Sequence, residues 1–335
     1  MRFIHDVSDD RWWDVANACS YATFFHTPLW ADIATAAEDV SGADPVAAEL
    51  SNGTTVVLPM VRLSPGGNRV FRRLRSSYAG CYGGLIADGP LTEEVTEFYD
   101  RVCGWRTAEC KVVESPLAPE EPGLDALNGG TVSTEEDFTQ ILPLDRPFDE
   151  LYDDFSKDRR YGVRKSKEAG VSVRGATTLD DYRTYYGAYQ ASIERWDDVS
   201  KTYSWEFFER IHELATERPE SIKLWVTEVD GEIASGALVF YWNGHAVNWH
   251  AAAYADYFSK YINDRIHADI IEDAVERGTE YYDFNPSGGI EGVVKFKSEF
   301  GPEKRPIRRW SYHDATFTAA QRLRDSIQTL TSVVE

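Results

Sequence analysis

The sequence has few of the residues and segments that mark disulfide-rich, metal-binding and membrane proteins. Four cysteines occur in 335 residues, without a Cys-x-x-Cys pair, so we expect reduced thiols. The seven histidines include no His-Glu-x-x-His motif and no cluster with cysteine at zinc-ligand spacing, so we expect no metal site. The start of the chain lacks the apolar core of a signal peptide, and no window approaches 18 apolar residues. These absences predict a cytoplasmic protein with no membrane insertion.

Lysine is scarce, and acidic residues dominate the charge. The chain carries 56 acidic against 35 basic residues, a formal net charge of -21, and only ten of the basic residues are lysines. Dense hydrated carboxylates keep a protein soluble in concentrated salt, so we predict a halophilic source. The bulk charge therefore says little about binding partners.

The hydrophobic patterns predict a mixed α/β chain with two domains, residues 1–145 and 146–335, divided near Pro143 and Pro147. Asn52-Gly53, Asp230-Gly231 and Asn243-Gly244 are typical hairpin turns between apolar runs. Each half reads as helix, hairpin, further strand, helix and strand, which indicates a structural duplication. In the second half we expect helices from residue 179, over 205–217 and over 259–277, and strands over 224–229, 233–241, 245–252 and 281–284.

A Gly-rich turn followed by Lys-Phe-Lys is the most informative stretch. If the run is a strand, Lys295 and Lys297 lie on the same face, with Phe296 pointing the other way, so that both lysines line one cleft. There they meet an anion or a developing negative charge. The alternative is a pair of solvated lysines at a sheet edge. Asp283, at the end of the preceding strand, is the candidate base or else a carboxylate that caps a turn. Asn285 either orients a substrate or shapes that turn.

One segment is strongly basic although the protein is acidic. It carries six basic side chains over residues 157–167, namely Lys157, Arg159, Arg160, Arg164, Lys165 and Lys167. We expect Arg160, Arg164 and Lys167 to contact the phosphates of a substrate, because direct contacts by arginine survive screening by salt. The alternative is a helix face that pairs with the protein's own carboxylates.

Two groups of tyrosines are further candidates for substrate binding. Tyr78 and Tyr82 lie in a glycine-rich stretch and are expected to line a groove between the domains. Tyr254 and Tyr261 lie in residues 251–263, where they stack on a base, line an acyl pocket, or simply pack at the start of a helix. That segment has no glycine, which argues against close backbone binding of a pyrophosphate.

The order of elements in the second half is similar to the GNAT acyltransferase fold. Two such units in tandem, with the segments 24–30, 160–171 and 292–301, resemble the Fem family of aminoacyl and peptidyl transferases. The resemblance implies two tandem GNAT-like domains, with an amine attacking an activated ester or thioester carbonyl. It also implies that Lys297 or Lys295 supports transfer and that the segment of Arg160 and Arg164 binds a phosphate-bearing substrate.

The resemblance further implies a co-substrate in place of a tightly bound cofactor. The donor would be aminoacyl-tRNA or acyl-CoA, and the acceptor a phosphate-bearing or cell-envelope precursor. No long heptad-patterned insertion is present, so the chain resembles the compact members of the family. Two alternatives remain: an acyl-CoA-dependent GNAT N-acyltransferase, and a non-enzymatic protein that binds RNA or an anionic glycan.

Overall fold

The computed structural model describes residues 1–64, 72–76, 78–104, 106–119, 127–195 and 202–319. The chain forms two compact units, one of Met1–Asp137 with Ile307–Glu335 and one of Phe138–Pro306. It passes between the units within strands β9 (Gly130–Pro143) and β15 (Glu303–Asp314). The division therefore lies at residues 137 and 138 instead of 145 and 146, and the last strand returns to the first unit.

The described residues of the first unit form two sheets together with α-helices. One sheet has the strand order β1-β3-β4-β7. The other contains, in spatial order, the end of β15, β8, β6, β5 and β2. The elements are β1 (Arg2–Ile4), α1 (Asp9–Ala18), η1 (Phe24–His26), α2 (Pro28–Thr35), β2 (Val40–Ala43), β3 (Val46–Glu49), β4 (Thr55–Leu58), β5 (Val61–Leu63), β6 (Arg72–Arg75), η2 (Tyr78–Gly80), β7 (Ile86–Ala87), α3 (Glu94–Val102) and β8 (Thr107–Val113). Its core joins residues distant in sequence, including Phe98, Val112 and Trp310.

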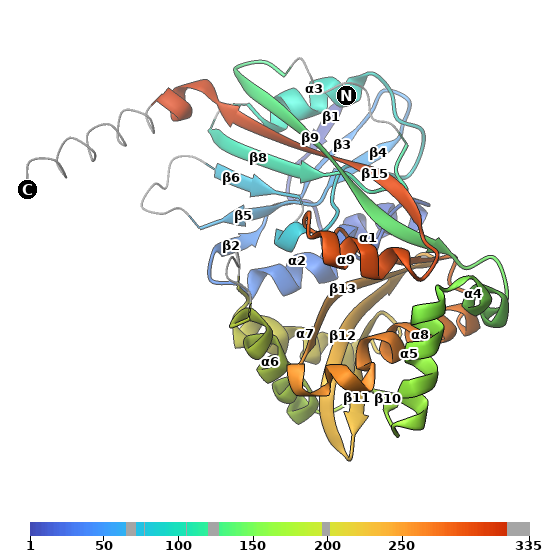
Figure 1. Cartoon of the computed structure of the whole chain (residues 1–335). Helices are drawn as coiled ribbons and strands as arrows, with labels where there is room; N and C mark the ends of the chain where they lie inside the picture. The colour runs from blue at the N-terminus through green and yellow to red at the C-terminus, as the bar shows by residue number, and fades with distance from the viewer. Residues whose placement is uncertain (65–71, 77, 105, 120–126, 196–201, 320–335) are drawn as a thin grey trace, which may run out of the picture. The chain divides into compact units, whose positions relative to one another are not determined.

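The second unit is built on one sheet with the strand order β10-β11-β12-β13-β14-β9 (Figure 1). Its strands are antiparallel except for the parallel pair of β13 and β14. The elements are α4 (Phe148–Asp154), α5 (Lys157–Glu168), β10 (Ser172–Gly175), α6 (Leu179–Ile193), α7 (Trp205–Glu217), β11 (Ile222–Val229), β12 (Glu232–Trp242), β13 (His245–Ala253), η3 (Ala255–Lys260), α8 (Ile262–Glu276), β14 (Tyr281–Asp283) and α9 (Glu291–Ser298).

The two hairpin turns predicted in the second half are confirmed. Asp230-Gly231 joins β11 to β12 and Asn243-Gly244 joins β12 to β13, with Val229 opposite Glu232 and Trp242 opposite His245. Each pair has positive φ at both positions, 54° and 86° in the first and 53° and 72° in the second. This backbone matches the right-handed twist of the flanking strands, and asparagine, aspartate and glycine tolerate it best.

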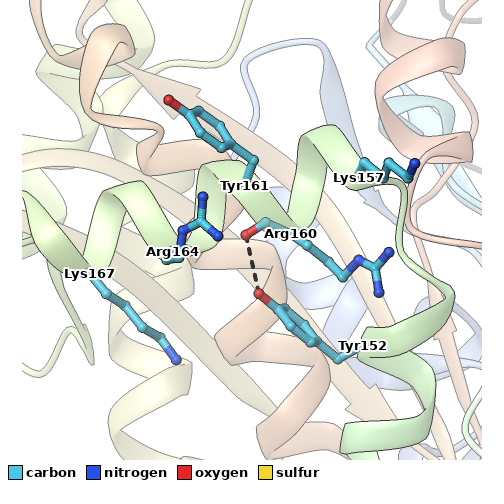
Figure 2. A pocket seen from close by; sticks show the side chains of 6 residues that line it. All are labelled: Tyr152, Lys157, Arg160, Tyr161, Arg164 and Lys167. Carbon is cyan, nitrogen blue, oxygen red and sulfur yellow. Dashed lines mark hydrogen bonds between the residues drawn. The ribbon is translucent and has the colours of Figure 1, made fainter.

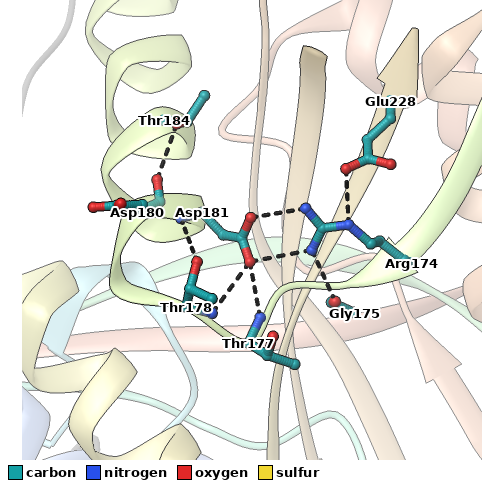
Figure 3. Close-up of polar contacts among 8 residues, drawn as sticks. All are labelled: Arg174, Gly175, Thr177, Thr178, Asp180, Asp181, Thr184 and Glu228. Atoms are coloured by element: carbon teal, nitrogen blue, oxygen red, sulfur yellow. Dashed lines mark hydrogen bonds and ion pairs between the residues drawn. The ribbon is translucent and has the colours of Figure 1, made fainter. Parts of the chain in front are cut away.

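A network of polar contacts holds the edge strand β10 to helix α6 (Figure 3). Arg174 Nη1 and Nη2 donate to both oxygens of Asp181 at 3.1 and 2.8 Å, and its Nε donates to Glu228 at 2.8 Å. Asp181 also accepts from the backbone N–H groups of Thr177 and Thr178 at the start of α6. Hydrogen bonds to Arg174 lower the pKa of Asp181 well below its ordinary range. This carboxylate caps the helix and orients it over the sheet.

The sheet opens between β13 and β14. The two strands pair only over His245–Val247 and Tyr281–Asp283, and beyond this point the chain turns away at Asn285, where φ is 60°. Trp249 is an extra residue in β13, because Leu238 pairs with His250 while Val239 pairs with Asn248. A bulge of this kind bends the strand and redirects its side chains. The outer half of β13 therefore lacks a parallel neighbour and forms the wall of a cleft.

Candidate active site

The cleft has a volume of about 320 Å³ and lies entirely within the second unit. Residues of β13, α8, the turn after β14 and α9 line it, and they include Asn248, Trp249, His267, Asn285, Phe296 and Lys297. Polar groups thus converge on a cavity whose walls are otherwise largely apolar. That is the usual composition of a small-molecule site.

The predicted strand around Lys297 is wrong, because residues 291–298 form helix α9. Gly288 and Gly289 both have positive φ and turn the chain so that the helix begins after Ile290. Residues two apart on a helix point in directions about 200° apart, so Lys295 and Lys297 cannot share a face. Lys297 is 9% exposed and lines the cleft, whereas Lys295 is exposed to solvent.

Lys297 is held in place by the turn that follows β14. Its Nζ donates to the backbone oxygen of Asn285 at 2.7 Å and reaches that of Pro286 at 3.5 Å. Burial lowers the pKa of Lys297 to about 8, and the charge of Asp283 opposes this effect. The side chain is therefore a fixed cation near neutral pH, with a pKa close enough to neutrality for proton transfer.

Asp283 is buried, and both of its carboxylate oxygens contact other groups of the protein. It accepts hydrogen bonds at Oδ1 from Thr139 Oγ1 and from the backbone N–H of Asn285, both at 2.7 Å. Its Oδ2 lies 3.1 Å from Nε2 of His245. Because Asp283 is also completely buried, its geometry is that of the turn-capping alternative. We therefore assign it no contact with a substrate.

Two amide oxygens at the cleft have no hydrogen-bond partner in the described part of the chain. They are Oδ1 of Asn248 and Oδ1 of Asn285, and both atoms are buried. An unpaired buried acceptor costs free energy unless a donor reaches it. Because both residues line the cleft, they offer hydrogen-bond acceptors to an incoming N–H group. Asn285, which sequence reasoning selected, thus lies beside Lys297, whereas Asn248 was missed.

The tyrosine candidates are not brought together. Tyr78 and Tyr82 are buried in the first unit, and Tyr78 donates to Asp39 at 2.6 Å, so neither presents a surface to a substrate. Tyr254 packs beside α6 and donates to the backbone oxygen of Thr184. Tyr261 precedes α8 in the left-handed conformation, and its partly exposed ring lies 5.8 Å from that of Tyr161. These contacts fit the packing alternative for Tyr254, and they place Tyr261 against α5.

The basic segment forms helix α5, and its cations line a second, shallow hollow of about 600 Å³ (Figure 2). Lys157, Arg160, Arg164 and Lys167 are spaced by three, four and three residues, which places them on one stripe of the helix. Tyr152 and Tyr161 complete the lining, and the hydroxyl of Tyr152 donates to the backbone oxygen of Arg160 at 3.3 Å.

The cations of this stripe are only weakly neutralised. Arg160 lies 3.7 Å from Asp153 and Arg164 lies 3.7 Å from Glu168, and both carboxylates are exposed. Lys157 and Lys167 make no ion pair with any described residue. Exposed pairs at such distances contribute little, so the stripe keeps most of its positive charge for a ligand.

Arg159 points the other way and fastens α5 to the cleft. Its Nη1 lies 2.7 Å from Asp264 of α8, its Nε lies 2.9 Å from Glu299 after α9, and its guanidinium lies over the ring of Phe296. Burial raises the pKa of Asp264 to about 6 even though Arg159 opposes the effect. The basic helix and the cleft are therefore parts of one packed structure within the second unit.

Neither a membrane helix nor a metal cluster occurs in the residues that the structure describes. No helix among them is long and apolar enough to cross a membrane. Likewise, those residues contain no group of three His, Cys, Asp or Glu side chains placed to hold a metal ion.

Residues 153–298 match the family of acetyltransferase (GNAT) domains. The chain is similar to the structure of FemX, with a TM-score of 0.68, 14% identity, and 92% of this chain and 97% of that chain covered. It is also similar to the C-terminal (DUF2156) domain of a putative lysylphosphatidylglycerol synthetase from Agrobacterium fabrum, with a TM-score of 0.57, 13% identity and 95% of both chains covered. The L-PGS of Bacillus licheniformis has a TM-score of 0.50, 13% identity, and coverage of 84% of this chain and 89% of that chain. No curated protein matches the sequence at a significant level.

Residues 153–298, which lie in the second unit, thus form an acyltransferase domain of the GNAT type. The likeness to FemX and to the DUF2156 domain extends over more than nine-tenths of the chain and shows a shared fold. The predicted fold class and the predicted enzyme class are thus confirmed.

Proposed function

We propose that this protein transfers an aminoacyl group from a polynucleotide carrier to an amine, and that the reaction takes place in the cleft of the second unit. The proposal rests on the position of Lys297. This buried cation is fixed by the turn after β14 and lines a cavity that also contains unpaired amide acceptors. An acceptor with a phosphate group or from the cell envelope fits the chemistry of the structural neighbours, one of which is a putative lysylphosphatidylglycerol synthetase.

The chemistry assigned to the cleft is addition followed by elimination. The amine lone pair forms a C–N bond to the ester carbonyl carbon, and the π electrons of the C=O bond move to its oxygen. When this intermediate collapses, the bond to the carrier oxygen breaks, the amine loses a proton and the carrier oxygen gains one. Lys297 faces the oxygen that becomes negative, where a fixed donor in a water-poor site stabilises the transition state.

The amide oxygens of Asn248 and Asn285 accept N–H groups of the attacking amine. Both are buried, so they would orient an amine that still carries its protons, and positioning of this kind lowers the barrier by holding the lone pair near the carbonyl carbon. Lys297 has a pKa of about 8, so its neutral form can also take up the proton that the amine releases.

The basic stripe on α5 supports a polynucleotide as the carrier. The distance from Lys157 to Lys167 along a helix is about 15 Å, and successive phosphates of one nucleic-acid strand in a duplex rise about 3.4 Å each. Four cations in a line therefore suit a run of phosphates better than a single one. Arginine also binds phosphate through two parallel hydrogen bonds, which gives the contact direction as well as charge.

The start of α8 also favours a polynucleotide carrier over coenzyme A. In place of a glycine-rich turn, the chain forms the 3-10 helix η3 and a left-handed Tyr261, and the first turn of α8 contains the buried carboxylate of Asp264. Helix N-termini bind anions through free N–H groups, and a carboxylate already placed there repels a pyrophosphate.

The experiment that tests this proposal measures the affinity for tRNA as a function of potassium chloride concentration. The Arg164→Gln variant should reduce the slope of log K against log salt by about 0.7 to 0.9, because one phosphate contact is lost.

A matched control is Arg183→Gln on α6. Arg183 has a similarly exposed side chain (57% against 63%), one ion pair with a nearby carboxylate at 3.5 Å, and an aromatic ring beneath its guanidinium, as Arg164 has. It lies outside the hollow, so its loss should leave the slope unchanged. Equal effects of the two substitutions, or saturable binding of acetyl-CoA without binding of tRNA, would refute the choice of carrier.

A further inference from the structure

We propose that His267 presents a neutral Nε2–H to the cleft and donates it to the substrate carbonyl oxygen as that oxygen becomes negative. The inference rests on the proposed function and assigns a second donor beside Lys297. His267 lies on α8 and is among the residues that line the cleft. Sequence reasoning did not select His267, because its neighbours Ile266 and Ala268 are apolar and the segment has the pattern of a buried helix.

A hydrogen bond to Tyr282 sets which ring nitrogen of His267 carries the proton. Nδ1 lies 2.9 Å from the hydroxyl of Tyr282, which is completely buried. The Tyr282 hydroxyl has no other hydrogen-bond acceptor among the described residues, and a buried donor without an acceptor is costly. Its own proton is therefore directed to Nδ1 of His267, and a neutral imidazole that accepts at Nδ1 must carry its proton at Nε2.

The remaining nitrogen faces the cavity. Nε2 of His267 has no hydrogen-bond partner among the described residues. It is not among the fully buried polar atoms that lack a partner, so the atom remains accessible. The ring is held by four aromatic rings, since its centroid lies 5.5 Å from those of Phe284, Phe296 and Phe300 and 6.3 Å from that of Tyr282. A donor that is fixed in this way loses little entropy when a carbonyl oxygen arrives.

The charges that face His267 keep it neutral. Lys297 on α9 and Arg159 on α5 are the cations that act on the ring, and Tyr282 on β14 is its titratable hydrogen-bond partner. Burial and these two cations lower the pKa of His267 to about 3. At neutral pH the imidazole is thus too weak a base to take the amine proton, but it remains a good donor.

The two donors have different tasks during transfer. As the amine forms its C–N bond, the carbonyl π electrons move to oxygen, and Lys297 supplies a charge while His267 supplies an uncharged N–H. When the intermediate collapses, both hydrogen bonds weaken and the carrier leaves with a proton. His267 neither gains nor loses a proton in this sequence.

The first test is 15N NMR of histidine-labelled protein without any ligand, with the signals assigned by the His267→Gln variant. We expect a protonated Nε2 and an unprotonated Nδ1 for His267 between pH 6 and 8. The Tyr282→Phe variant removes the donor to Nδ1 and should give a mixture of tautomers. The Tyr185→Phe variant is the matched control, because Tyr185 is also buried and bonds to a histidine, His250, which does not line the cleft.

A proton on Nδ1, or an imidazolium at pH 7, would overturn the inference. The second test is the single-turnover rate of transfer from aminoacyl-tRNA to hydroxylamine as the amine. The His267→Leu variant should be at least about ten-fold slower with unchanged tRNA affinity, and His267→Gln, which keeps an N–H, should be less impaired. A His267→Leu rate equal to that of the wild type overturns the catalytic role. Absence of transfer by the wild type overturns the proposed function itself, whatever the tautomer.

Discussion

Replacing Lys297 with methionine should separate stability from activity, because the lysine is buried at a cost to the fold. The pKa of Lys297 is lowered from its ordinary value of 10.5 to about 8, a difference that corresponds to about 3 kcal/mol. Methionine removes that cost while filling a similar volume. It also removes the hydrogen bond to the backbone oxygen of Asn285, and an unpaired buried acceptor costs about 1 to 3 kcal/mol. The two effects nearly cancel at pH 7.

We therefore expect the Lys297→Met variant to unfold in urea with a free energy equal to that of the wild type or up to about 2 kcal/mol higher. The single-turnover rate of transfer from aminoacyl-tRNA to hydroxylamine should fall about 10²- to 10³-fold, as is typical when one donor to a developing oxyanion is lost. The Lys295→Met variant is the control, since Lys295 is exposed on the same helix. Its stability should change by no more than about 0.5 kcal/mol, and its rate should not change.

The pH dependence gives a sharper form of the same prediction. Between about pH 8 and pH 10.5, the folded wild type has lost the proton of Lys297 while the unfolded chain still holds it. Stability rises with pH wherever the unfolded state binds more protons, so the wild type should gain up to about 3 kcal/mol relative to Lys297→Met across this window. A constant difference between the two proteins would show that the lysine is not buried as a charge. A loss of more than about 3 kcal/mol at pH 7 would assign it a structural role instead.

Two further predictions concern the scaffold of the second unit, and both are measured by urea denaturation. Gly162→Ala places a methyl group 2.6 Å from the carboxylate of Asp264 and should lower the free energy of unfolding by about 1 to 3 kcal/mol. The control, Gly292→Ala on α9, places its methyl group in open space and should be neutral or slightly stabilising. Equal effects of the two substitutions would contradict the packing of α5 on α8. Asp181→Asn breaks the pair with Arg174 and should cost about 1 to 3 kcal/mol at pH 7. The pKa of Asp181 is lowered on folding, so the wild type should keep its full advantage in free energy of unfolding above about pH 4 and lose it as the pH falls further. An advantage that stays constant at lower pH would contradict the role given to this ion pair.

Local patterns predicted much of the second unit correctly. The helix from Trp205 to Glu217 has the predicted bounds, and the hairpin turns have the expected backbone. Both depend on contacts within a few residues, so a single sequence suffices to find them. The long return of the chain into the first unit could not be found in this way, because Arg309 pairs with Val113 almost 200 residues earlier.

The segment of Lys297 shows why a short apolar run is ambiguous. Val293, Val294 and Phe296 suit a strand by composition, yet contacts with distant residues select the helix. Gln140 donates to the backbone oxygen of Val294, and the ring of Phe296 packs against His267. Sequence reasoning thus selected a lysine that lines the cleft but gave its segment the wrong secondary structure, and this error placed Lys295 on the same face.

The residues that sequence reasoning missed share one property: they become accessible only where β13 and β14 part. Asn248 and His267 each lie inside apolar patterns and would be satisfied core residues in a closed sheet. The signal that distinguishes them is the bulge at Trp249, and a bulge depends on the register of two strands, which the local pattern does not show.

The choice of aminoacyl-tRNA as the donor is tested by comparing the affinities of the protein for aminoacylated tRNA, uncharged tRNA and acetyl-CoA under one set of conditions. We expect aminoacylated tRNA to bind more tightly than uncharged tRNA, and we expect Lys297→Met to weaken this preference while Lys295→Met retains it. Equal affinity for charged and uncharged tRNA, together with saturable binding of acetyl-CoA, would contradict the account.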